Sequence, residues 1–104
     1  MINVADDANR GPTFGWDFNG AIHAVHPARR GSLNEVGQWN TIEITANGTM
    51  IRVVVNDQIV TDTDIRNLRA WVTATGLHNK SGNINFTAHR GETDVRNIRI
   101  KELP

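Results

Sequence analysis

The sequence predicts an all-β fold of antiparallel strands, a β-sandwich or a barrel, in one domain that covers residues 1–104. No stretch of about eleven residues or more keeps apolar residues at helical spacing without an interrupting Gly, Pro or Asn. Short segments instead alternate apolar and polar residues, as half-buried strands do. Turn-forming residues separate these segments at regular intervals, which is typical of sandwiches and barrels.

The clearest element is a meander predicted over residues 39–61. Its strands are expected at Trp39–Thr45, Met50–Val55 and Gln58–Thr61. Asn47-Gly48 follows the first strand, and because both residue types tolerate positive φ, a type I′ turn is expected there. A second polar turn is expected at Asn56-Asp57. The alternation also predicts one buried face, formed by Ile42, Ile44, Ile51, Val53 and Val55.

Further strands are expected on both sides of the meander, at Ile2–Ala5, Ala21–Val25, Ala70–Ala74, Asn83–Ala88 and Asp94–Glu102. In the last of these, Ile98 and Ile100 share one face. Two long polar loops, Asp6–Gly20 and Pro27–Gly37, flank the second expected strand. Loops of this length in a small β domain are more often functional than accidental, and disorder is the competing interpretation.

Composition excludes several classes of partner and site. Eleven Lys and Arg residues balance eleven Asp and Glu residues without a basic run, so the basic field that nucleic acid requires is missing. The apolar runs are far too short for a membrane span, and the N-terminus has no export-signal pattern. The chain has no Cys, which excludes disulfides and leaves the compartment open between cytoplasm and periplasm. Stability must come from sheet pairing, packing or oligomerisation.

Several titratable residues are candidates for a site. Asp6 and Asp7 open a polar loop, where they could accept hydrogen bonds from sugar hydroxyls, bind a divalent ion such as calcium, or form a solvated turn. His23, in an expected strand, and His26, before a proline, could serve acid-base chemistry or metal binding, with packing or exposure as the alternative. His89 stands in an expected turn, where it could face a ligand or cap backbone groups. Nothing in this pattern requires a cofactor.

Trp16 is the aromatic candidate for a sugar contact, because the apolar face of a pyranose ring suits an indole. The candidate substrate-binding set is Trp16, His26 and Arg29. Arg29-Arg30 is also compatible with a solvated loop pair. We expect Trp39 and Trp71 to pack in the core or at a sheet edge. We expect Arg96 to be structural, with its guanidinium paired to a carboxylate.

The C-terminal residues carry a recognisable phrase. Gly82–Gly91 is a glycine-led strand pattern that ends in a His-containing turn, and Val95–Leu103 closes the chain with Val-Arg-Asn-Ile-Arg-Ile-Lys-Glu-Leu. Upstream stand Gln38-Trp39-Asn40, the acidic pair that ends Asn3–Asp7, and Gly-Ala-Ile-His at Gly20–His23. These features resemble the bacterial 3-keto-disaccharide hydrolase family, whose members usually have an aromatic residue in place of the valine of the closing phrase and Tyr in place of the histidine after Gly-Ala-Ile.

The resemblance implies a concanavalin-like jelly roll of two sheets, of which this chain corresponds to about the second half. It also implies a periplasmic or secreted location and action on sugars oxidised at the 3-position. In such sugars the ketone acidifies a neighbouring C–H and permits elimination of the glycosidic substituent. This chemistry needs an acid and a base, and the catalytic candidates are Asp6, Asp7, His23 and His89.

Three functions are therefore compatible with the sequence: an enzyme acting on a modified glycoside, a non-catalytic carbohydrate-binding domain, and a structural fragment that recovers missing strands from a second copy. A lone curved sheet would expose open strand edges and an apolar face that carries Ile98 and Ile100, so we expect a homodimer or higher oligomer. The competing arrangement is a smaller barrel closed by the N-terminal segment. The expected partner is a carbohydrate, with neither nucleic acid nor membrane.

Overall fold

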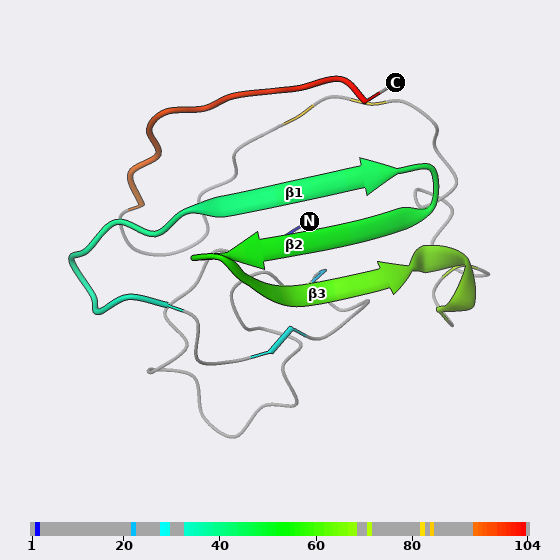
Figure 1. Cartoon of the computed structure of the whole chain (residues 1–104), viewed down its shortest axis with the longest axis horizontal. Coiled ribbons are helices and arrows are strands. Elements are labelled where there is room, and N and C mark those ends of the chain that lie inside the picture. Colours follow the sequence, from blue (N-terminus) through cyan, green and yellow to red (C-terminus); the bar gives the residue numbers. More distant parts are fainter. Residues whose placement is uncertain are drawn as a thin grey trace.

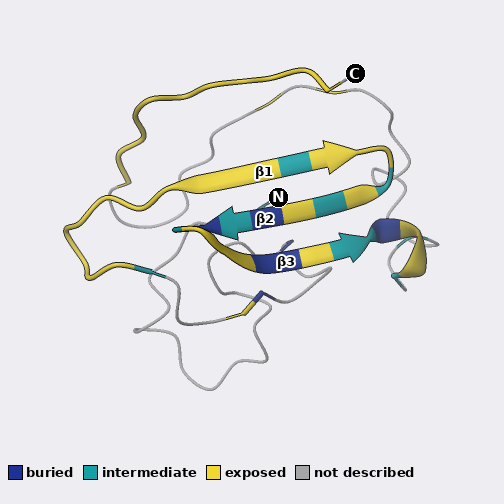
Figure 2. Cartoon of the chain, in the orientation of Figure 1, coloured by how far each residue is buried: buried dark blue, intermediate teal, exposed yellow. Residues whose placement is uncertain are grey.

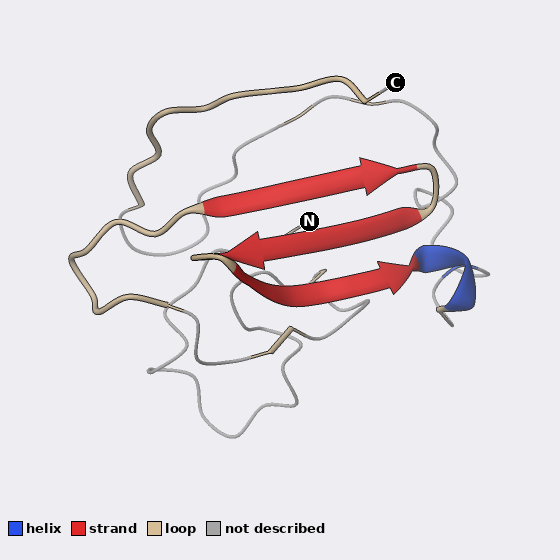
Figure 3. Ribbon diagram, viewed as in Figure 1, coloured by secondary structure: helices blue, strands red, loops and turns tan. Residues whose placement is uncertain are grey.

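An open antiparallel sheet of three strands forms the centre of the molecule (Figure 1). The computed structural model describes residues 2, 22, 28–29, 33–68, 71, 82, 84 and 93–103. Within them the elements, shown by type in Figure 3, are β1 (Ile42–Asn47), β2 (Met50–Val55), β3 (Gln58–Asp64) and the short 3-10 helix η2 (Ile65–Asn67). The predicted all-β fold and the meander are confirmed, and the second sheet of a sandwich stays a prediction.

Two tight turns set the register of the meander. Asn56 and Asp57 join β2 to β3 with φ values of 49° and 69°, both positive as a type I′ turn requires. Gly48 and Thr49 join β1 to β2, and of these only Gly48 has a positive φ, 61°, which matches the type II′ pattern. The first turn was therefore predicted one residue too early and with the wrong type, because Asn47 still belongs to β1.

A bulge in β3 changes which side chains the sheet buries. Val53 pairs with Thr61 whereas Val54 pairs with Ile59, so Val60 is an extra residue in β3. Val60 and Thr61 are both buried, with exposed fractions of 4% and 2%, although they are neighbours in the chain. Strict alternation would bury only one of them, so the bulge adds a side chain to the core.

The core lies against β2 and β3 (Figure 2). Its buried members are Ala28, Val53, Val55 and Val60, and the partly buried side chains packed against them are Ile2, Leu33 and Ile51. Val53 and Val55 are 0% and 1% exposed. Complete burial of such a side chain stabilises a fold by about 1.5 to 3 kcal/mol, so Val53 and Val55 each contribute a stabilisation of that order.

The predicted buried face is correct on β2 and wrong on β1. Val53 and Val55 are buried and Ile51 is partly buried, as expected. Ile42 and Ile44 lie opposite Val55 and Val53 in the register, hence on the same face, yet they are 39% and 50% exposed. The physical reason is position in the sheet: β1 is an edge strand, and the core residues from outside the sheet pack on the valines of β2 and β3.

Asp64 ends β3 and caps η2. Its side chain accepts a hydrogen bond from the backbone N–H of Arg66 at 3.0 Å and pairs with the guanidinium of the same residue at 2.8 Å. Ile65 is buried, and its N–H donates to the carbonyl of Thr49 at 2.9 Å. These bonds fix the end of β3 to the turn between β1 and β2.

Predictions outside the meander have mixed outcomes. Ile2 and Ile22 form an isolated antiparallel bridge, as the two N-terminal strands would. Trp71, expected in a strand, has a helical backbone. The strand predicted at Asp94–Glu102 is wrong: these residues form no strand, and Asn97 interrupts the extended backbone with a φ of 56°. The strand predicted at 83–88 lies outside the described residues apart from residue 84.

Candidate functional site

Most of the residues expected in a site lie outside the described part of the chain. These are the catalytic candidates Asp6, Asp7, His23 and His89 and the substrate-binding candidates Trp16 and His26. Their roles stay predictions. Arg29 is the member of the set whose place in the structure is described.

Arg29 is held at the outer edge of β3. Its backbone N–H donates to the carbonyl of Val60 at 2.9 Å. Its neighbour Ala28 is buried in the core, which fixes the chain at this point. Arg29 itself is exposed. Its guanidinium is therefore available to donate hydrogen bonds to a hydroxyl or an anion, as a substrate contact would.

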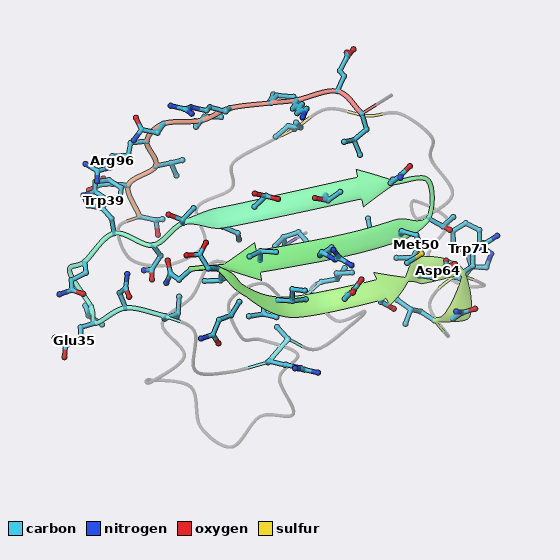
Figure 4. The ribbon with its side chains drawn as sticks, viewed as in Figure 1. Glu35, Trp39, Met50, Asp64, Trp71 and Arg96 are labelled. Carbon is cyan, nitrogen blue, oxygen red and sulfur yellow. The ribbon has the colours of Figure 1, made fainter. Side chains whose placement is uncertain are left out.

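An exposed aromatic platform, formed by Trp39 and Arg96, lies at the start of β1 (Figure 4). The guanidinium carbon of Arg96 is 3.8 Å from the centroid of the Trp39 ring, which is a cation–π contact. Trp39 is nevertheless 48% exposed. Because Arg96 covers one ring face and almost half of Trp39 remains accessible, the indole retains apolar surface for a ligand.

A network of asparagine amides holds the backbone around Trp39. Asn34 donates from its side chain to the carbonyl of Trp39 at 2.9 Å and from its backbone to Oδ1 of Asn40 at 2.8 Å. The same Oδ1 accepts from Nδ2 of Asn56 at 2.7 Å, and Oδ1 of Asn56 accepts from the N–H of Thr41 at 2.9 Å. The loop before β1 is thereby tied to the β2–β3 turn. Such preorganisation reduces the entropy lost when a ligand binds.

The chain turns sharply just before the platform. The N–H of Gln38 donates to the carbonyl of Glu35 at 3.0 Å, and Gly37 between them has a φ of 92°, where a residue with a side chain would be strained. Glu35 and Gln38 are both exposed. The surface therefore combines an indole, a guanidinium, amides and a carboxylate, which suit the apolar faces and the hydroxyls of a sugar.

The strongest electrostatic perturbation lies at the opposite end of the sheet, where Figure 4 shows Asp64. Hydrogen bonds from Arg66, first from its side chain and then from its backbone, hold the pKa of Asp64 well below its usual range, and the same pair raises the pKa of Arg66. Arg52 and Asp62 form an ion pair of 3.2 Å across β2 and β3. Both carboxylates are engaged by arginines, so we interpret them as structural and not as acid-base groups.

Metal binding has no support within the described residues, where no group of three or more His, Cys, Asp or Glu side chains could hold an ion. The divalent ion considered for Asp6 and Asp7 stays a prediction. In the same part of the chain, no helix is long and apolar enough to cross a membrane.

Trp39 and Arg96 form a contact that the sequence did not predict. Trp39 was expected to pack in the core or at a sheet edge; it lies just before the outer strand β1 and is half exposed. Arg96 was expected to pair with a carboxylate; it stacks on Trp39 instead, and no described carboxylate forms an ion pair with it. The two residues are far apart in the sequence, so no local spacing could reveal their contact.

One protein family matches almost the whole chain. The family described as 3-keto-alpha-glucoside-1,2-lyase-like domain matches residues 1–101. The chain belongs to this family. The match to the lyase-like family agrees with the resemblance at the C-terminal residues and covers every candidate site residue named above. Separate searches of the curated proteins and of the solved structures found no significant match.

Proposed function

We propose that this lyase-like domain binds a 3-keto-glycoside and acts on its glycosidic bond. The observation that carries the proposal is the family match over residues 1–101. In a 3-keto sugar, the carbonyl acidifies the C–H at carbon 2. A base can remove that proton, the C1–C2 double bond forms as the C1–O bond breaks, and an acid protonates the leaving oxygen.

The proposed roles follow the chemistry of each side chain. Asp6, Asp7, His23 and His89 are the proposed acid and base groups, because carboxylates and imidazoles transfer protons near neutral pH. The proposed substrate contacts are Trp16, His26 and Arg29. A divalent ion could assist by polarising the ketone, and no step of the elimination requires it.

The platform of Trp39 and Arg96 supports a carbohydrate ligand independently of the family. Trp39 offers an apolar ring surface, and Arg96 offers donors in a fixed fork. The asparagine network keeps the surrounding loop in place. We propose that this end of the sheet contacts a sugar unit of the substrate.

The experiment that tests this function measures release of the aglycone from a 3-keto-α-glucoside by the full chain. We expect turnover by the wild type, and at least about a hundredfold loss in the variant that removes the base or the acid. The test variants are Asp6→Asn, Asp7→Asn, His23→Ala and His89→Ala. The matched control is His78→Ala, which should retain activity because His78 is the histidine outside the candidate site residues. Binding of the glycoside without turnover would favour the non-catalytic carbohydrate-binding alternative.

A second candidate function, a structural or self-assembling fragment, is favoured by one observation. The apolar side chains of Ile42, Ile44, Ile98 and Ile100 are 39% to 74% exposed. Exposed apolar surface beside an open strand edge promotes association. We therefore propose that the chain, as one domain of residues 1–104 that supplies about half of a family jelly roll, forms a homodimer or higher oligomer.

Light scattering at micromolar concentration tests the oligomer. A mass of at least twice 11.5 kDa is expected. A monodisperse mass near 11.5 kDa, together with cooperative unfolding, would contradict it and would favour an N-terminal segment that closes the fold within one chain.

A further inference from the structure

The outer edge of β1 is open in the described part of the chain. β1 pairs with β2 on one side only. The other edge of the sheet, on β3, is met by the N–H of Arg29. β1 contains no Lys or Pro and pairs with β2 without a bulge, so the charge of Glu43 is its one protective feature. Such an edge is able to accept a further strand.

The register shows which backbone groups face this edge. The N–H of Asn56 donates to the carbonyl of Thr41 at 2.9 Å, so the backbone groups of Thr41 point toward β2. Because this direction alternates along an antiparallel strand, the N–H and C=O groups of Ile42 and Ile44 point outward. The same two residues are 39% and 50% exposed. Ile42 and Ile44 therefore present both outward-pointing backbone groups and exposed apolar side chains.

The C-terminal segment, residues 93–103, carries a complementary pattern. Ile98-Arg99-Ile100 has isoleucines that are 59% and 74% exposed, with a basic residue between them. Ile42-Glu43-Ile44 in β1 has an acidic residue between its isoleucines. Laid strand against strand, the isoleucines meet on one face and Glu43 meets Arg99 on the other. Apolar and opposite-charge pairs across neighbouring strands both stabilise a sheet.

One contact already aligns the segment with β1. Arg96 stacks on Trp39, and in the view of Figure 1 the segment then runs in the same direction as β1, on the side of its open edge. Ile98 is the second residue after Arg96, and Ile42 is the third residue after Trp39. The difference of one residue, about 3.3 Å along a strand, is within the reach of an arginine side chain. Asn97, with a φ of 56°, bends the chain between the contact and Ile98.

We propose that residues 98–101, which form no strand in this structure, dock on β1 of the same chain as a fourth, parallel strand. Ile98 then lies beside Ile42, and Ile100 beside Ile44. Docking buries the four isoleucines against one another and satisfies the open edge, so it is the alternative, within one chain, to the association of two copies. It also keeps Arg96 over Trp39, where the cation–π contact is already formed.

The parallel register fixes which backbone groups bond. In a parallel ladder, a residue bonds to the two residues that flank its neighbour. The N–H groups of Arg99 and Lys101 then donate to the carbonyls of Ile42 and Ile44. The N–H groups of residues 98 and 100 point away from β1.

Amide hydrogen exchange of the full chain tests this register. We expect the amides of Arg99 and Lys101 to exchange at least about tenfold more slowly than those of Ile98 and Ile100. Equal and unprotected exchange at all four amides would overturn the proposal. Protection that rises with protein concentration would also overturn it, because the strand would then come from a second copy.

Charge reversal tests the pairing of Glu43 with Arg99. Each of Glu43→Arg and Arg99→Glu should abolish the protection, and the double variant should restore it. Lys101→Glu is the matched control, since its neighbour in this register is Thr45, and it should leave the protection in place. Both members of the pair are exposed, and amide protection in β2 verifies that each variant folds. Loss of protection in the double variant would overturn the proposal.

Discussion

Val53 and Ile44 lie directly opposite each other in neighbouring strands, on the same face of the sheet. Val53 is 0% exposed and Ile44 is 50% exposed. The alternation of apolar and polar residues predicted correctly that both side chains lie on one face. It could not show how far the core extends across that face, because coverage depends on residues that are distant in the chain, such as Ala28.

The difference in exposure between Val53 and Ile44 predicts that truncating the two side chains lowers the free energy of unfolding by different amounts. Val53→Ala should lower the free energy of unfolding by about 2 kcal/mol, because it removes fully buried methyl groups and leaves a cavity. Ile44→Ala should cost less than Val53→Ala, although it removes more atoms, because half of Ile44 faces water until residues 98–101 dock on β1. Urea denaturation of the two variants measures both values. Equal costs would show that the β1 face is covered as well as the β2 face.

The lowered pKa of Asp64 predicts that the free energy of unfolding depends on pH in the acid range. Its pKa in the folded protein is lowered by hydrogen bonds from Arg66, so the stability it contributes is present above its unfolded pKa of about 3.9 and is lost as the pH falls below that value. The free energy of unfolding should therefore decrease below about pH 4, and less steeply in Asp64→Asn. Denaturation at a series of pH values measures the slopes, and identical slopes in the two proteins would contradict this role.

At the scale of elements, the turns were the most predictable feature. Asn56 and Asp57 both tolerate positive φ, and this local preference alone places the β2–β3 turn. The bulge at Val60 could not be predicted, because it depends on how β3 meets β2. The strand expected at Asp94–Glu102 did not form although its alternation is favourable, because Asn97, next to Arg96 in the chain, leaves the extended conformation with a φ of 56°.

The amide network at the start of β1 also predicts an effect on stability. Asn56→Gly keeps a residue that tolerates positive φ but removes the side-chain bonds to Thr41 and Asn40. We expect a loss of about 1 to 2 kcal/mol. Asp57→Gly is the matched control in the same turn, and it should cost less. Thermal unfolding compares the two variants, and an equal loss in both would show that the turn conformation matters more than the network.

At the scale of the whole molecule, the described core covers only part of one sheet face. Open edges and exposed isoleucines remain on β1 and on the C-terminal segment. The sequence was sufficient for the all-β class, because that class depends on local alternation. It was insufficient for the platform of Trp39 and Arg96, since that contact exists only after distant segments meet.

The central claim is that this member of the 3-keto-alpha-glucoside-1,2-lyase-like family recognises a 3-keto-glycoside. Calorimetric titration of the full chain with a 3-keto-α-glucoside, and with the parent glucoside that lacks the ketone, tests it most directly. We predict measurable binding of the keto sugar, weakened at least about tenfold for the parent glucoside and for Trp39→Ala, since tenfold corresponds to about 1.4 kcal/mol. Absence of binding and of turnover with the keto sugar would contradict the claim.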